Sequence, residues 1–191
     1  MTVPPLPTPS QTVGPFYGYA LPFTGGGEIA PAGHPDAVTV HGRVLDGDGS
    51  PVPDALLDFW QAAPDGSRTG APGSLRRDPV TGAVLGRHGV DFTGFGRVAT
   101  DADGHWALRT LLPRHDTPYL SICVFARGLL HHLYTRAYLP VPGYEPDALL
   151  VSLPAERRAT LLADEERSGV YGFDIRLQGG TTEETVFLDF H

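Results

Sequence analysis

Glycine and proline recur so often in this chain that most of it cannot form long helices. The 191 residues include 24 glycines and 19 prolines. Proline removes a backbone donor and glycine weakens a helix, so both residues favour turns. The chain is nevertheless 41% hydrophobic, which is enough to bury a core between short elements. The length fits one domain with room for an arm.

Alternating side chains predict several short strands. Apolar and polar residues alternate between positions 38 and 44, as in a half-buried strand. The segment LLDFWQA predicts a second strand, with Leu57 and Phe59 on one face and Trp60 on the other. GFGRVAT and HWALRTLL flank DADG and predict a hairpin. Four later segments also predict strands: YLSICVFARG, LLHHLYTRAYLP, YGFDIRLQG and ETVFLDF.

One helix is expected late in the chain, in PAERRATLLADEER, where Pro154 stands in the first turn and Gly169 follows the end. Residues 62–92 form a long, polar, glycine-rich stretch that we interpret as a functional loop. About eight short strands and one late helix predict a mainly β fold, an antiparallel β-sandwich. We expect an N-terminal arm and loop at 1–37 and the sandwich domain at 38–191.

Charge and cysteine content limit the classes of function. The net charge of −8 and the pI of about 5.3 argue against a nucleic-acid surface, although local basic spots could serve a small anion. The lone Cys123 can form no disulfide within the chain, which favours a reducing compartment. We find no secretory signal pattern and no apolar run near the ~20 residues of a membrane span. These features predict a soluble, cytoplasmic protein.

The sequence offers no complete metal site or catalytic triad. His131 and His132 are adjacent, so on a strand they would point to opposite faces, and the sequence has no His-x-His. It also has no Gly-x-Ser-x-Gly motif. Arg127 follows the apolar run ICVFA and precedes Gly128. Its guanidinium could bind a ligand carboxylate through two parallel hydrogen bonds, or it could form a structural ion pair or a solvated strand end.

Several segments together resemble the intradiol ring-cleavage dioxygenases. They are TPSQTVGPF, GRVLDGDG, DFWQA, GFGRVATDADGHWALRT, FARG, TRAYL and YGFDIRLQG with ETVFLDF. The resemblance runs from about Thr8 to Phe190. TPSQTVGPF with FARG is similar to the alpha subunits of hetero-oligomeric members of this family. The resemblance implies cleavage of protocatechuate by O2 between its two hydroxyls, giving 3-carboxy-cis,cis-muconate.

Catalytic subunits of the family hold Fe(III) through two tyrosines and two histidines, and the iron acts as a Lewis acid on the bound catechol. This chain departs from that pattern. Arg68 stands at one tyrosine position, and Tyr119 and Ser121 stand at the histidine positions. Residues 113–118 are too few to hold the segment with the second tyrosine. The resemblance therefore implies that this chain has no catalytic or metal-binding residue, and that a partner beta subunit holds the Fe(III).

The resemblance also gives a role to the aromatic arm TPSQTVGPFYGYALPF. Alpha arms of the family wall the substrate pocket of the beta subunit. This implies that Thr12, Gly14, Pro15 and Arg127 bind substrate, with Arg127 balancing the substrate carboxylate. Proline fixes the backbone and glycine allows close approach to a flat ring.

Two alternatives for the function of the chain stay open: a stand-alone intradiol dioxygenase for another catechol, and a non-enzymatic transthyretin-like interaction module.

Overall fold

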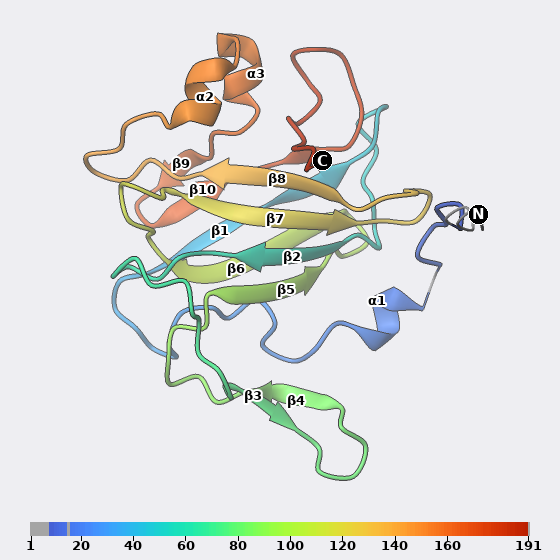
Figure 1. Cartoon of the computed structure of the whole chain (residues 1–191), viewed down its shortest axis with the longest axis vertical. Coiled ribbons are helices and arrows are strands. Elements are labelled where there is room, and N and C mark those ends of the chain that lie inside the picture. Colours follow the sequence, from blue (N-terminus) through green and yellow to red (C-terminus); the bar gives the residue numbers. More distant parts are fainter. Residues whose placement is uncertain (1–7, 15, 191) are drawn as a thin grey trace, which may run out of the picture.

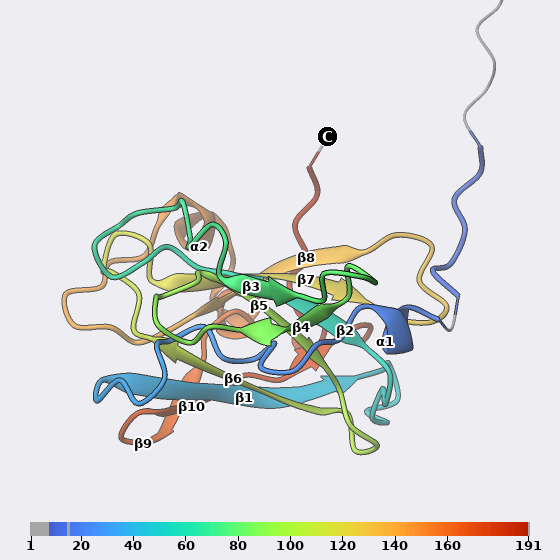
Figure 2. The ribbon, with the colours of Figure 1, turned by 90° about the horizontal axis from the view of Figure 1, so that it is seen from below.

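The computed structural model describes residues 8–14 and 16–190. Two β-sheets pack face to face, and a small separate hairpin projects from them (Figures 1 and 2). The first sheet has the strand order β11-β1-β10-β9, and β6 pairs with β1 as its fifth strand. The second sheet has the strand order β5-β2-β7-β8. The strands are β1 Ala37–Leu45, β2 Leu56–Trp60, β3 Leu75–Arg77, β4 Val84–Arg87, β5 Phe95–Ala99, β6 His105–Leu111, β7 Tyr119–Phe125, β8 Leu133–Tyr138, β9 Asp164–Arg167, β10 Val170–Gly172 and β11 Ile175–Arg176.

The core lies between the two sheets and is built mainly from alternate residues of the longer strands, such as β1, β6 and β7. On β7, Leu120, Ile122 and Val124 are almost fully buried, and the residues between them face outward. Across the core, the rings of Phe59 on β2 and Trp106 on β6 lie 5.0 Å apart between centroids. The predicted mainly β sandwich is therefore confirmed. β1 pairs antiparallel with β6 and parallel with β10 and β11.

The described helices are short: α1 Tyr17–Ala20, α2 Ala148–Ser152 and α3 Ala155–Ala159. The late helix was predicted to extend close to Gly169, but it ends at Ala159. The next segment instead forms β9, which pairs antiparallel with β10, and Gly169 makes the turn between them with a φ of +74°. Pairing with a neighbouring strand has overridden the local helical preference of this acidic segment.

The predicted hairpin around DADG is wrong. β5 pairs with β2, whereas β6 pairs with β1 in the opposite sheet, so the chain crosses the sandwich at this turn. Asp101 stabilises the turn by accepting hydrogen bonds from the backbone N–H groups of Asp103 and His105, at 3.0 and 2.9 Å. Gly96 of β5 faces Leu108 of β6 across the core, and a Cβ at Gly96 would stand only 2.7 Å from that leucine. The two segments therefore face each other across the core and are not neighbours in one sheet.

Two further expectations need correction. Residues 62–92 are not a structureless loop, because they contain the β3–β4 hairpin, which lies apart from the sandwich in Figure 1. ETVFLDF forms none of the named strands. It has a single bridge, between Leu188 and Tyr134, and Val186 accepts a hydrogen bond from the hydroxyl of Thr135 on β8 at 2.8 Å. In the part of the chain that the structure describes, no helix has the length and apolar character needed to cross a membrane.

Candidate functional site at the end of β7

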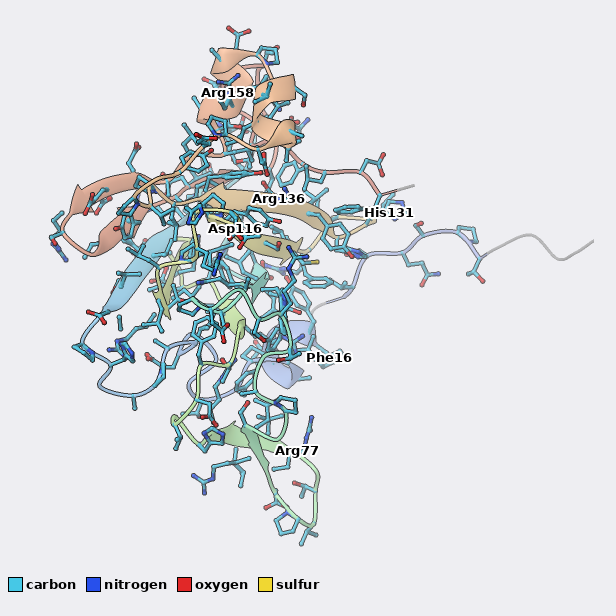
Figure 3. All side chains as sticks on the ribbon, turned by 60° about the vertical axis from the view of Figure 1, so that its left-hand side comes forward. Phe16, Arg77, Asp116, His131, Arg136 and Arg158 are labelled. Carbon is cyan, nitrogen blue, oxygen red and sulfur yellow. The ribbon has the colours of Figure 1, made fainter. Side chains whose placement is uncertain are left out.

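The N-terminal arm lies against the turn that joins β7 and β8. The hydroxyl oxygen of Thr12 accepts a hydrogen bond from the backbone N–H of Gly128 at 3.2 Å. Gln11 and Val13 share a cavity of about 160 Å³ with Phe125 and with residues 129–132 of the turn. Figure 3 shows His131 of this turn beside the arm. The structure thus brings Thr12 next to Arg127, two residues that the sequence placed in one site.

Gly14 gives the arm a conformation that other residues rarely adopt. Its φ is +73°, and no heavy atom lies within 4 Å of the position that a Cβ would take. Space alone would therefore permit a side chain here, and the backbone conformation is what favours glycine. Pro15, which the sequence also assigned to the site, lies outside the described residues. Phe16 and Tyr19 follow with side chains that are 80% and 87% exposed.

Arg127 lies just beyond the end of β7 and forms an ion pair. Its Nε contacts a carboxylate oxygen of Asp54. The structural ion pair that the sequence left open is therefore present. The Arg127 side chain is 60% exposed, so this pair contributes little to stability, as is usual for solvent-accessible ion pairs. Among the described residues, no hydrogen-bond acceptor is found for its two terminal nitrogens, which leaves part of the guanidinium available to a ligand.

Tyr17 fastens the arm to the same aspartate. Its hydroxyl donates a hydrogen bond to the backbone oxygen of Asp54. Burial raises the pKa of Tyr17, the charge of Asp54 raises it further, and the nearby Arg127 lowers it. Sequence reasoning missed both residues. Asp54 belongs to a segment with the composition of a turn, and Tyr17 is one of several aromatic residues in the arm, so neither carried a distinguishing signal.

A second cluster lies on the outer face of β7 and β8, where the resemblance placed the lost iron ligands. We call this cluster the degenerate centre. It comprises Tyr119, Ser121, Arg136, Tyr138 and Asp147. Ser121 pairs with Arg136 in the strand register. The guanidinium carbon of Arg136 lies 4.1 Å from the centroid of the Tyr119 ring, a cation–π contact. Figure 3 shows Arg136 extending from β8.

The carboxylate of Asp147 completes this cluster. Arg136 Nη1 donates to an oxygen of Asp147 at 3.2 Å and to the Tyr138 hydroxyl at 3.1 Å. The Tyr138 hydroxyl in turn donates to Asp147 at 2.8 Å. Asp147 also begins α2, since its other oxygen accepts the backbone N–H of Leu150 at 3.0 Å. Burial raises the pKa of Tyr138, which keeps this hydroxyl protonated.

The residues of the degenerate centre do not fit a ferric ion. The guanidinium of Arg136 is fixed over Tyr119, so a second cation at that place would be repelled. Ser121 offers a neutral hydroxyl, and Arg68, at a position matched to a tyrosine ligand, is an exposed cation. Among residues 8–14 and 16–190, no group of three or more histidine, cysteine, aspartate or glutamate side chains is arranged to hold a metal.

An apolar cavity of about 190 Å³ lies beside the degenerate centre on the same outer face. Its wall includes Cys123 and the partly exposed aromatic residues Trp60, Tyr134 and Phe190. Burial raises the pKa of the Cys123 thiol to about 12, with a smaller contribution from the charge of Asp58. The thiol is therefore a poor nucleophile and a poor metal ligand at neutral pH.

Comparisons with known proteins agree with this geometry. A sequence model of the dioxygenase family matches residues 15–121. The chain is 37% identical to a protein named protocatechuate 3,4-dioxygenase alpha chain from Burkholderia cepacia, over 95% of this chain and 96% of that one. It is 34% identical to a protein of the same name from Pseudomonas putida, over 96% of each chain.

Solved structures show the same fold. The dioxygenase domain of a dioxygenase–carbohydrate-binding fusion from Streptomyces sp. SirexAA-E superposes with a TM-score of 0.54 at 27% identity. That match covers 91% of this chain and 99% of the domain. Catechol 1,2-dioxygenase from Pseudomonas arvilla C-1 matches with a TM-score of 0.51 at 18% identity, over 80% of this chain and 55% of that one, which supports the fold alone. The chain belongs to the intradiol ring-cleavage dioxygenase family.

Proposed function

We propose that this chain is the alpha subunit of a protocatechuate 3,4-dioxygenase. The partner is a beta subunit that holds Fe(III), and the complex cleaves protocatechuate with O2 to 3-carboxy-cis,cis-muconate. The observation that carries the proposal is the similarity, over nearly the whole chain, to two proteins named as alpha chains. The degenerate centre supports this proposal. The guanidinium of Arg136 lies over the ring of Tyr119, so a cation of the protein itself stands beside a position that matches an iron ligand in catalytic subunits.

In this proposal the chain contributes binding and positioning. The arm residues Thr12, Gly14 and Pro15 wall the substrate pocket of the partner subunit and exclude water from it. Arg127 directs its terminal nitrogens toward the carboxylate of protocatechuate, while Asp54 holds its Nε. A planar guanidinium with one edge already bound is restricted in orientation, which lowers the entropy lost when the substrate carboxylate binds.

Exposed aromatic residues support the existence of a partner. Phe16 and Tyr19 on the arm and Phe190 near the other end of the chain are between 68% and 87% exposed. Aromatic side chains are enriched at protein interfaces because they bury a large area when the partner binds. We place the complex in the cytoplasm, where the lone Cys123 would stay reduced.

The test is to produce the full chain alone and together with a family member that has the Tyr, Tyr, His, His ligand set. Iron content, O2 uptake with protocatechuate and the ring-opened product are measured for both preparations. We expect activity and bound iron in the complex, and no stoichiometric iron in the lone chain. A lone chain that binds one iron and cleaves a catechol would support the stand-alone dioxygenase. A lone chain that stays monomeric by light scattering and ignores every such partner would support the interaction module.

A further inference from the structure

Another cavity lies between the β3–β4 hairpin and the loop that follows α1. It has a volume of about 550 Å³. Residues 24–33 form one wall, and Leu85, Gly86 and Arg87 of β4 form another. The guanidinium-bearing side chains of Arg76, Arg87 and Arg109 all line it. The substrate site proposed above uses none of these residues.

Arg87 is a partly buried cation without a matching anion. Its terminal nitrogens donate to the hydroxyl of Thr93 and, at 3.4 Å, to the backbone oxygen of Gly26. Its Nε is buried and has no hydrogen-bond partner. Among the described residues, no carboxylate lies within ion-pair distance of this guanidinium. Burial lowers the pKa of Arg87 to about 10, against a smaller opposing effect of Glu28. A buried charge is stabilised when an opposite charge pairs with it.

The other charges around the cavity do not neutralise Arg87. The carboxylate of Glu28 lies 3.8 Å from Arg109, and its side chain is 55% exposed. Asp91 faces His88 at 3.5 Å. Arg76 is exposed, and no interaction of its side chain is found among the described residues. Three guanidinium groups thus share the cavity with two carboxylates, which leaves an excess of positive charge.

The surroundings of Arg87 favour an organic anion. Its guanidinium carbon lies 5.4 Å from the ring centroid of Phe23 and 5.9 Å from that of Phe95. These rings cover Arg87 but do not line the cavity, whose apolar wall is made by Ala30, Ala32 and Leu85. A planar guanidinium matches the two oxygens of a carboxylate, and an apolar wall favours a carbon skeleton attached to it. Inorganic phosphate would gain the charge interaction but would use nothing of the apolar wall.

We propose that this cavity binds a small organic carboxylate, with the carboxylate on Arg87 and the apolar part against Leu85 and the two alanines. The site needs neither iron nor a partner subunit. It therefore stands independently of the function proposed above. Benzoate is a suitable probe, because it carries one carboxylate on an apolar ring and has no hydroxyls with which to chelate iron.

Isothermal titration of the full chain with benzoate, benzamide and inorganic phosphate tests the proposal. We expect saturable binding of benzoate and none of benzamide, which has the same shape without the charge. Arg87→Met should weaken benzoate binding about 10- to 150-fold, the range for loss of a charge-assisted hydrogen bond. Arg68→Met is the matched control, because Arg68 is exposed and does not line the cavity. The Arg68→Met variant should bind benzoate with the same affinity as the unmodified chain.

Two further variants keep the test independent of folding defects at Arg87. Leu85 is 51% exposed, so Leu85→Glu should fold and should abolish binding by placing a negative charge at the cavity wall. Glu28→Gln removes a competing carboxylate and should strengthen benzoate binding. Saturation by phosphate but not benzoate would overturn the organic class of ligand. The absence of saturable benzoate binding, or equal affinity in Arg87→Met or Leu85→Glu, would overturn the site itself.

Discussion

Arg136 in the degenerate centre and Arg127 at the end of β7 both pair with an aspartate, but their surroundings differ. The Arg136 side chain is 24% exposed, stacks on Tyr119, and shares Asp147 with a tyrosine hydroxyl. The Arg127 side chain is 60% exposed and uses its Nε alone to pair with Asp54. Arg136 Nη1 is bound by two oxygens of its own chain and the guanidinium is stacked on a ring, whereas Arg127 is held at Nε alone.

This difference separates a structural charge from a charge available for binding. A guanidinium that is partly buried among its own partners serves the fold, because removal of one partner leaves the others unpaired. A solvent-accessible guanidinium that is held at one edge contributes little to stability and can accept a carboxylate at the other edge. Two of the four predictions below test this distinction directly, and the other two test the surroundings of each arginine.

The largest expected effect concerns Cys123, on the same outer face as the degenerate centre. A pKa raised from 9.0 to about 12 leaves about 1,000-fold less thiolate at pH 8. Because the thiolate is the nucleophile, alkylation by iodoacetamide should be slower than in the urea-unfolded chain by about this factor. Mass spectrometry after timed quenching measures both rates. Equal rates would mean that solvent reaches this face freely. The contrast between a desolvated degenerate centre and a solvent-accessible Arg127 would then no longer hold.

The next effect is on stability at the degenerate centre. Asp147→Ala should lower the free energy of unfolding by about 2–4 kcal/mol, since it removes a helix cap and the charged partner of Arg136 and Tyr138. Asp54→Ala is the matched control and should cost less than about 1 kcal/mol, because its arginine is exposed. Urea unfolding of the lone chain measures both. A larger loss for Asp54→Ala would reverse our assignment of the two arginines.

Arg127→Ala should act on catalysis in the assembled enzyme. We expect kcat/KM for protocatechuate to fall about 10- to 150-fold, which corresponds to the 1.5–3 kcal/mol of a charge-assisted hydrogen bond. Much of the loss should appear in KM, and Arg127→Lys should recover only part of it. Catechol, which lacks the carboxylate, is the control substrate and should lose far less. Equal losses for both substrates would assign Arg127 to structure alone.

The smallest effect is expected at Gly14. An alanine with a φ near +73° is strained by about 1–2 kcal/mol, so Gly14→Ala should lower kcat/KM of the complex about 5- to 30-fold. The lone chain can relieve this strain by moving its arm, so its free energy of unfolding should stay within about 0.5 kcal/mol. Gly18→Ala is the control, because Gly18 has an ordinary helical backbone. Unchanged activity in Gly14→Ala would mean that the backbone conformation of the arm at this position does not contribute to the substrate site.

The sequence by itself determined the strands whose side chains alternate, and with them the fold class. β1, β2, β7 and β8 lie where the apolar periodicity predicted them. Periodicity is a local property, so a local pattern reveals it. The motifs shared with the family also placed Thr12 and Arg127 in one site, and the structure brings the two residues together. Their role toward substrate remains a prediction.

Only the tertiary structure decided which distant residues meet. The partner of Arg127 is Asp54, and the network of Arg136 closes through Asp147, although neither aspartate stands out in its own segment. The crossing at DADG and the end of α3 were also decided by strand pairing across the sandwich. Such pairings depend on loop closure and on burial against the opposite sheet, which are properties of the whole chain and leave no periodic trace in a short segment.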